Sequence, residues 1–401
     1  MIRQAALFAL LLLPFVLPTN GEASRTPDAI VFDPAVMAET KERVLRRDPA
    51  LMPAFRRLIA EADKAIVADA ESVIFKPTPP PRGDRHDYWS LAPYWWPDPD
   101  QPRGLPYVRR DGERNPKADA DAYDHGRLNR MAHDVLTLSL AWFLTENEMY
   151  AGKATALVWA WCCDSFTRMN PRLDFAHFRP GISPGTSTGV LDAVPLVWVC
   201  EAARILQPSR SWSDVVTHKT QAWFKEYCQW LLDSELGRGA AARADRVGVW
   251  RDAQLVVFAL YSGDMKLART VAETAHQRIE SQIERNGSLP QELRRARSRH
   301  ATFSTLQAFF VLAAASERLG IDLWRWGDVH GGSIKRALDF AAPHFNPARP
   351  WPFGDVGQYD PMRFTALFYR AALVYSDDQY RKTLGFLSRH QLETDPHQLF
   401  Y

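Results

Sequence analysis

The sequence predicts an all-α protein, built as an (α/α) toroid of antiparallel helical hairpins. Apolar residues recur three and four positions apart over most of the chain, which is the period of an amphipathic helix. Strict alternation of apolar and polar residues is almost absent, which argues against a substantial sheet. The helical segments have short connections and no fixed sequence period, and this favours a closed ring of hairpins over a regular repeat array.

The expected helices follow one another along the chain, and each ends at a short break that contains Gly, Pro, Asp or Asn. Such residues interrupt a helix and allow the chain to turn back on itself. Helices are expected at residues 34–47, 53–70, 121–145, 150–169, 190–206, 212–234, 250–262, 265–285, 291–319, 333–342 and 363–375.

The first 23 residues differ from the rest of the chain. Arg3 is followed by a nearly unbroken apolar stretch over residues 5–17, and Gly21-Glu22-Ala23 offers small residues at the two positions that a signal peptidase reads. We therefore predict a signal peptide at residues 1–23, a single domain at residues 24–401, and a periplasmic or secreted protein. The apolar stretch is too short for a membrane span and no Cys follows it, so no membrane anchor is expected.

Composition excludes several classes of partner. The chain has 49 Lys and Arg against 47 Asp and Glu, a net charge of +2, and no long run of one sign, so a nucleic-acid partner is not expected. The four Cys residues show neither a disulfide framework nor the spacing of a metal site. We interpret them as buried free thiols, and we expect no metal and no other cofactor.

Residues 76–117 break the helical pattern with many Pro, aromatic and charged residues. A structureless loop of this length is either functional or disordered. Its aromatic content is too high for a solvated disordered segment. We expect an ordered, extended segment that packs on the helices and lines or covers a cleft.

Part of this segment resembles a known family. It reads Asp87-Tyr-Trp-Ser-Leu-Ala-Pro-Tyr-Trp-Trp-Pro-Asp-Pro99 and continues with Gly104-Leu-Pro-Tyr107 and Arg110-Asp-Gly-Glu-Arg-Asn-Pro116. These runs resemble the N-terminal signature of the alginate lyase family of polysaccharide lyases. Further pieces follow in the family's order: Asn129-Arg-Met-Ala-His-Asp134, Thr167-Arg-Met-Asn-Pro171, Gly189-Val-Leu-Asp192, Trp250 with Asp252 and Gln254, Tyr261-Ser-Gly-Asp264, and Asn286-Gly-Ser-Leu-Pro-Gln-Glu-Leu293.

The resemblance implies an (α/α) toroid with a deep groove, and cleavage of an anionic, uronic-acid polysaccharide or oligosaccharide by β-elimination. Removing the C5 proton of a uronate creates negative charge beside its carboxylate, so cations or hydrogen-bond donors must face that carboxylate. A base takes the proton, and an acid protonates the departing O4. Families of this kind typically neutralise the carboxylate with an Asn-His pair and an Arg, and use a Tyr as acid and often as base.

The chain departs from this pattern at both catalytic positions. Aligned on Trp250, the expected Asn-Asn-His falls on Asp245-Arg246-Val247, which removes the imidazole. Aligned on Glu292-Leu293 and Ser298, the expected Tyr falls on Ala301, and the retained cation is Arg295 or Arg297. His300 matches a His of the family.

Two interpretations remain open. In the first, the protein is a lyase in which Arg246 or Arg295 neutralises the carboxylate, since a guanidinium presents a planar fork to it. His300 or Tyr123 then takes the proton, and the arginines around His300 favour its neutral form. In the second, the groove binds an anionic glycan without cleaving it efficiently.

Further residues are candidates for substrate binding, and each also has a purely structural interpretation. Tyr94 and Trp95 either stack on sugar rings or pin the extended segment to the core. His125 and Asn129 share one helix face, and the remaining candidates lie in loops or at anchor positions of the resemblance. The candidates are Arg297, Asn170, Arg168, His177, Tyr94, Trp95, Trp250, Asn129 and His125.

A glycoside hydrolase on the same toroid is an alternative enzyme class. It requires two carboxylates across the groove. Asp245, Asp252 and Glu292 are the carboxylates that the motifs bring together.

Overall fold

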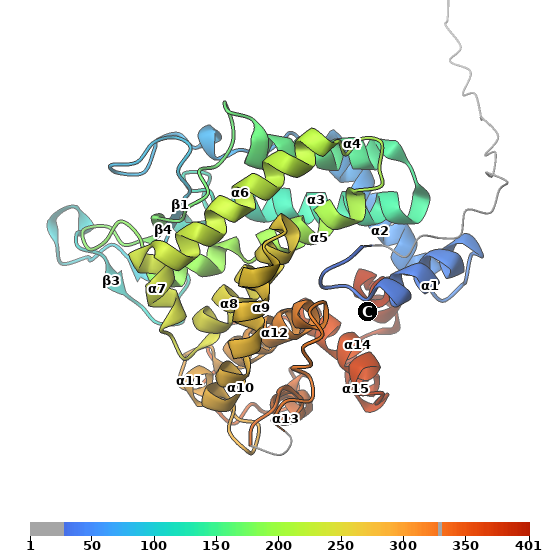
Figure 1. Ribbon diagram of the computed structural model, residues 1–401. Coiled ribbons are helices and arrows are strands. Elements are labelled where there is room, and N and C mark those ends of the chain that lie inside the picture. Colours follow the sequence, from blue (N-terminus) through green and yellow to red (C-terminus); the bar gives the residue numbers. More distant parts are fainter. Residues whose placement is uncertain (1–27, 328–330) are drawn as a thin grey trace, which may run out of the picture.

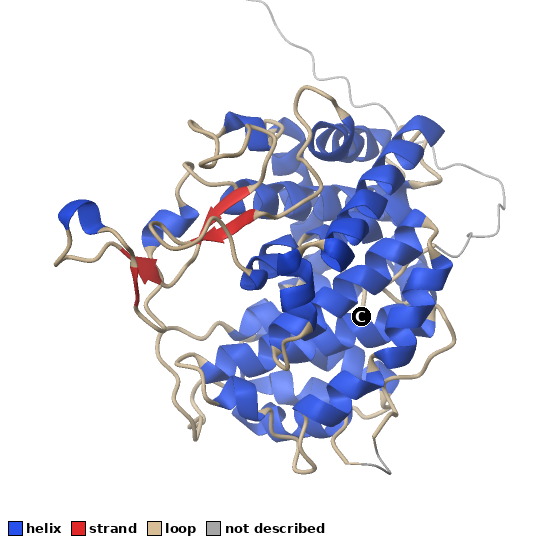
Figure 2. Cartoon of the chain, turned by 60° about the vertical axis from the view of Figure 1, so that its left-hand side comes forward, coloured by secondary structure: helices blue, strands red, loops and turns tan. Residues whose placement is uncertain are grey.

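The computed structural model describes residues 28–327 and 331–401. Helices make up most of the molecule, and the few strands lie with long loops on one side of the helical body (Figures 1 and 2). The all-α prediction is confirmed. The signal peptide expected at residues 1–23 lies outside the described residues, and the single domain at residues 24–401 stays a prediction.

The α-helices are spread along the whole described chain and agree with most of the expected segments. Their bounds, in chain order, are α1 Pro34–Leu45, α2 Met52–Val67, α3 His125–Thr145, α4 Glu148–Val158, α5 Leu196–Leu206, α6 Asp214–Asp233, α7 Glu235–Ala241, α8 Arg246–Ser262, α9 Met265–Thr274, α10 His276–Gln282, α11 Pro290–Leu293, α12 Ser298–Glu317, α13 Ile334–Ala341, α14 Thr365–Val374, α15 Gln379–Thr383 and α16 Arg389–Thr394.

Helices α3, α8 and α12 form the centre of the core. Helix α8 packs against α12, α6, α9 and α5, and α3 packs against α4, α5 and α2. Leu255, Val256 and Phe258 of α8 are fully buried, as expected for a helix that is apolar on most sides. Among the described residues, no helix has both the length and the apolar character needed to cross a bilayer.

The strands belong to two small sheets, one between the segment 76–117 and a later strand and one within the segment itself. Strand β1 (Trp89–Leu91) pairs in parallel with β4 (Phe175–Phe178), and β2 (Trp95–Trp96) pairs antiparallel with β3 (Val108–Arg109). The segment is therefore ordered and extended, as its composition indicated. It lies along one side of the helical body (Figure 2).

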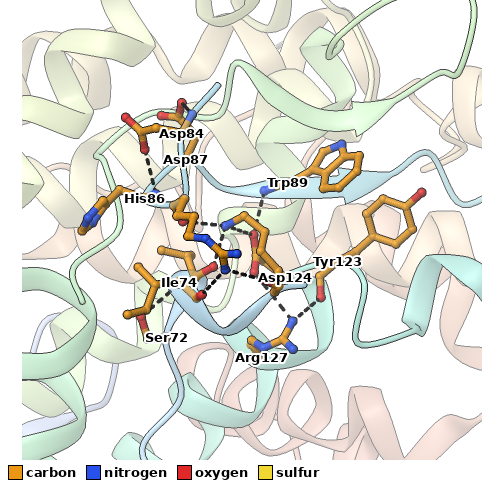
Figure 3. Close-up of polar contacts among 12 residues, drawn as sticks. Ser72, Ile74, Asp84, His86, Asp87, Trp89, Tyr123, Asp124 and Arg127 are labelled. Carbon is orange, nitrogen blue, oxygen red and sulfur yellow. Dashed lines mark hydrogen bonds and ion pairs between the residues drawn. The ribbon is translucent and has the colours of Figure 1, made fainter. Parts of the chain in front are cut away.

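A buried ion pair fixes the start of this segment to α3. Lys76 and Asp124 are both fully buried, and their side chains are 3.0 Å apart. The ammonium of Lys76 also donates to the carbonyl oxygens of Val73 at 2.6 Å and Arg85 at 2.8 Å. Asp124 accepts from the backbone N–H of Trp89 at 2.9 Å, which connects α3 to β1 (Figure 3).

The four cysteines, Cys162, Cys163, Cys200 and Cys228, are buried and free, in agreement with the sequence interpretation. Burial raises the pKa of the Cys162 and Cys200 thiols well above the usual range. These thiols therefore act as small apolar groups of the core.

Candidate active site

A cavity of about 280 Å³ opens where the extended segment faces the helical body. Five parts of the chain form its walls: residues 92–95, residues 109–112, the stretch from β4 to the short 3-10 helix Ser187–Ala193, the N-terminal end of α8, and the N-terminal end of α12. Seven of the residues singled out from the sequence line it, namely Tyr94, Trp95, His177, Arg246, Arg295, Arg297 and His300.

A network of ion pairs holds the two helix ends together. Asp245 caps α8 by accepting from the backbone N–H of Val247 at 3.0 Å, which satisfies a donor that the helix leaves free. Arg295 donates to Asp245 and to Glu292, both at 2.7 Å. Burial alone would raise the pKa of Asp245, but Arg243 and Arg295 outweigh it and hold the pKa below its usual range.

Six arginines line the cavity, and they fall into two groups. Three are neutralised by carboxylates of the protein: Arg109 by Asp111, Arg243 by Asp245, and Arg295 by Asp245 and Glu292. The other three, Arg179, Arg246 and Arg297, form no ion pair with any carboxylate of the described residues. The cavity therefore carries uncompensated positive charge, and it is suited to an anionic ligand.

Arg246 is the most deeply placed of the uncompensated arginines. Its backbone N–H donates to Glu292 at 2.8 Å, which fixes the position of the main chain. Its Nε is buried and has no hydrogen-bond partner among the described residues. An unpaired buried donor is costly, so this guanidinium is ready to accept an anion.

His300 lies in the first turn of α12 beside these arginines. Burial, followed by the charges of Arg246, Arg297 and Arg363, lowers the pKa of His300 to about 3. Its ring packs edge-on against Phe364 with the centroids 5.5 Å apart. His300 is therefore a neutral imidazole in the free protein at ordinary pH.

The two positions at which the chain departs from the family pattern also line the cavity. Val247 stands where the resemblance expects a His, and Ala301 stands where it expects a Tyr. Both side chains are aliphatic and neither can transfer a proton. Other side chains that can transfer a proton do line the cavity, among them His300, His177 and Tyr94.

His177 belongs to a hydrogen-bond network that the sequence did not predict. Its Nε2 lies 3.1 Å from Oδ1 of Asp192, and its Nδ1 lies 2.9 Å from the Thr188 hydroxyl. His177 also adopts a left-handed backbone conformation with φ of 54°, which is uncommon outside glycine. The buried Asp192 carboxylate binds His125 as well, with Nδ1 3.3 Å away, and accepts from Ser90 at 2.5 Å.

Tyr94 and Trp95 line the cavity on the side of the extended segment. The guanidinium of Arg179 lies over the Trp95 ring, 4.6 Å from its centroid. One face of this ring is therefore taken by a cation of the protein. This contact supports the interpretation in which Trp95 anchors the extended segment, and stacking of Tyr94 or Trp95 on a sugar ring stays a prediction.

Five of the candidates do not line the cavity. Asn170 donates to Asp87 at 2.8 Å, and the carbonyl of Arg168 is bonded to His86 at 2.7 Å, so both hold the base of β1. Asn129 bonds to the carbonyl and the ring of His125, and His125 reaches the site only through Asp192. Trp250 is buried and lines a separate cavity of about 90 Å³.

Tyr123, the alternative base, is also absent from the cavity lining. Its ring packs edge-on against Trp89 with the centroids 4.9 Å apart (Figure 3). Burial raises its pKa to about 12. This leaves His300 as the base candidate that faces the cavity.

Sequence reasoning missed Arg109, Arg179, Arg243 and Thr188, and it gave Asp192 no role. The available signals were weak. Arg179 precedes Pro180-Gly181, and loop residues of this kind often line clefts. Asp192 lies in a piece of the resemblance, but its contact with His177 depends on the packing of β4 against the 3-10 helix Ser187–Ala193.

Comparison with known proteins agrees with this geometry. The sequence profile of the alginate lyase family matches residues 72–351. A crystal structure of an alginate lyase from Bacteroides ovatus is 29% identical, with a TM-score of 0.87, and the match covers 94% of this chain and 99% of that one. No curated protein gives a significant match.

A more distant structure shares the fold. Alginate lyase A1-III from Sphingomonas species A1 is 15% identical with a TM-score of 0.56, over 95% of this chain and 99% of that one. A variant of A1-III in complex with a tetrasaccharide is 14% identical with a TM-score of 0.55, over 86% and 94%. Because the family profile covers most of the chain, this protein belongs to the alginate lyase family and is a polysaccharide lyase.

Proposed function

We propose that this protein cleaves alginate or a related polyuronate by β-elimination in the arginine-lined cavity. The observation that carries the proposal is the convergence of Arg246 and Arg297, both without a carboxylate partner among the described residues, on the neutral imidazole of His300. This combination supplies the two things that the reaction needs first, a cation for the carboxylate and a base for the C5 proton.

The roles follow from the electrostatics. Arg246 and Arg297 bind the substrate carboxylate and stabilise the charge that develops on it as the proton leaves. Arg295 acts mainly by holding Asp245 and Glu292, since its charge is already shared between them. His300 takes the C5 proton.

The low pKa of His300 in the free protein is compatible with this role. Part of the lowering is due to the positive charges of Arg246, Arg297 and Arg363. A bound carboxylate compensates those charges, so the pKa of His300 rises when substrate binds. The imidazole thus becomes a stronger base in the complex than in the free protein.

The hydrolase alternative loses support because its carboxylates are paired. Asp245 binds Arg243 and Arg295, Asp252 binds Arg251 and Arg278, and Glu292 binds Arg295. A glycosidase needs one of its carboxyl groups as an acid, and guanidinium partners oppose protonation. A non-catalytic oligouronate-binding protein is the second candidate, favoured by the aliphatic side chains of Val247 and Ala301.

The family relatives support an anionic saccharide as the partner, since a variant of A1-III binds a tetrasaccharide. We expect no metal or other cofactor in the reaction. The apolar stretch at residues 5–17 supports export to the periplasm or the medium.

An ultraviolet assay of the purified protein on alginate, polyglucuronate and a neutral glucan tests the proposal. β-Elimination leaves an unsaturated uronate that absorbs in the ultraviolet, whereas hydrolysis gives reducing ends without this absorbance. We expect absorbance with at least one polyuronate and none with the glucan. Tight binding of a polyuronate with no product would favour the binding protein instead.

A further inference from the structure

The proposed function assigns a base and a cation to the reaction but no general acid. β-Elimination needs an acid for the departing glycosidic oxygen, and Ala301 stands at the position where the resemblance expects the Tyr that serves as acid. His300 is neutral in the free protein, and it is already assigned to the C5 proton. A different group that faces the same cavity must supply the proton for the oxygen.

We propose that His177 supplies this proton through the hydroxyl of Thr188. Both residues line the cavity that contains His300. Asp192 Oδ1, His177 Nε2, His177 Nδ1 and Thr188 Oγ1 form a continuous chain of contacts at 3.1 Å and 2.9 Å. This inference rests on the lyase function proposed above and adds a residue to it.

Both ring nitrogens of His177 have a hydrogen-bond partner. An imidazolium has two N–H donors, and here each one has an acceptor: Asp192 at Nε2 and Thr188 at Nδ1. Asp192 is 4% exposed, so its charge acts in a medium of low polarity. Other charged or titratable groups around this carboxylate are His125 from α3, with Arg114 and Asp119 beyond it, and Tyr88.

The Thr188 hydroxyl connects this pair to the substrate. Besides His177, it contacts the hydroxyl of Thr186 at 2.8 Å, and Thr188 is half-buried at the cavity wall. In the proposed step, the hydroxyl proton of Thr188 moves to the glycosidic oxygen as the C4–O bond breaks. The Nδ1 proton of His177 moves to Thr188 at the same time.

The step is balanced. The C5 proton goes to His300, and the electron pair of the C5–H bond becomes the C4–C5 double bond. The electron pair of the C4–O bond stays on the oxygen, which the Thr188 proton neutralises. His177 ends as a neutral ring that still donates from Nε2 to Asp192, and exchange with water returns both histidines to their starting states.

A change of leaving group separates an acid from a residue that only supports the cavity. A synthetic uronide whose 4-oxygen carries a nitrophenyl group releases a stable phenolate, so its elimination needs no acid. We expect His177→Gln to slow cleavage of the polyuronate by about a hundredfold or more, in line with the usual contribution of such groups. The same variant should keep the parent rate on the nitrophenyl substrate within about threefold.

Variants of Thr188 provide an independent measurement. Thr188→Val, which keeps the shape but removes the hydroxyl, should show the same selective loss, and Thr188→Ser should restore polymer cleavage. Tyr94→Phe removes the phenolic hydroxyl that also lines the cavity, and it tests whether that hydroxyl is the acid instead. A selective loss in Tyr94→Phe instead of His177→Gln would assign the acid to Tyr94 and overturn the proposal.

Two further outcomes separate this inference from the proposed function. If the parent cleaves both substrates and His177→Gln loses activity equally on both, His177 has only an architectural role and the acid proposal is wrong. If the parent gives unsaturated product from no polyuronate and not from the nitrophenyl substrate, the lyase function itself fails.

Discussion

Arg295 donates a 2.7 Å hydrogen bond to Asp245, although fifty positions separate the two residues in the chain. The contact joins the loop before α12 to the residue that caps α8. Through it, the two helix ends that carry Arg246 and His300 keep a fixed relation to each other. Arg295 is therefore a structural residue of the site as well as one of its cations.

Arg295→Ala should destabilise the protein. The substitution leaves the buried Glu292 without an ion-pair partner among the described residues and Asp245 with Arg243 alone, and removing one partner of a buried ion pair typically costs up to about 3 to 5 kcal/mol. Denaturant unfolding measures the loss. Arg46→Met breaks an exposed pair with Glu42 on α1 and should change the midpoint little; equal effects of the two variants would contradict this role.

Arg246→Ala should weaken binding without a comparable loss of stability. Arg246 has no carboxylate partner among the described residues, and a hydrogen bond to a charged group contributes about 1.5 to 3 kcal/mol. The dissociation constant for an oligouronate, measured by calorimetry, should rise about tenfold or more. Arg210→Ala, which removes an exposed arginine from outside the cavity lining, is the control. Unchanged binding in Arg246→Ala would remove this residue from the substrate site.

His300→Ala should lower the rate of product formation by about a hundredfold or more, because general bases typically contribute 10²- to 10⁴-fold. Binding should be largely retained, since Arg246 and Arg297 remain. The pKa of His300, about 3, also sets the pH range in which it can act as a base. In the free protein its deprotonation is complete above about pH 5. The pH dependence of kcat/KM checks this pKa. A rise of kcat/KM with a pKa near 6.5 in the parent, absent from His300→Ala, would contradict the low pKa of His300.

Lys76→Met should destabilise the fold by up to about 3 kcal/mol, because it removes the nearest cation of the buried Asp124 and leaves only Arg127, 3.8 Å away. Burial raises the pKa of Asp124 to about 6, even though Lys76 opposes the shift. Without Lys76 the carboxyl becomes neutral over a wider pH range, so the loss should be smaller at acidic pH. Denaturant unfolding at about pH 5 and about pH 8 checks this prediction, and a loss independent of pH would contradict it.

Asp192→Asn should remove a pH-dependent stabilisation that involves His125. Burial alone would lower the pKa of His125, but the charge and hydrogen bond of Asp192 raise it. A raised folded-state pKa gives stability that is complete below the unfolded value near 6.5 and is lost as pH rises through the folded pKa. NMR titration of His125 should show a pKa above 6.5 in the parent and below it in the variant.

The helical fold could be predicted because it follows from local patterns. The period of apolar residues identifies α3, α8 and α12, and these are the helices that form the core. The extended segment could be predicted as ordered because its aromatic residues had to be buried. Its parallel pairing with β4 could not, since residues 89 and 175 meet only through the tertiary fold.

Part of the candidate site could also be predicted from local sequence patterns. Arg246, Arg295 and His300 lie at helix N-terminal ends within short motifs, so their neighbourhood is visible in the sequence. Whether an arginine is free or neutralised depends on contacts between distant segments, as with Arg295 and Asp245. The sequence therefore indicated three of the six cavity arginines, and it could not distinguish the paired Arg295 from the unpaired Arg246.

The uncompensated arginines also have a consequence for how a polymer first meets the protein. The net charge of the whole chain is only +2, so long-range attraction of a polyanion by the molecule as a whole is weak. The field is concentrated at one opening, because a cleft lined by uncompensated charges of one sign focuses it. Encounter should therefore be steered to that opening at low ionic strength and slow down as salt shortens the reach of the field to about 10 Å or less.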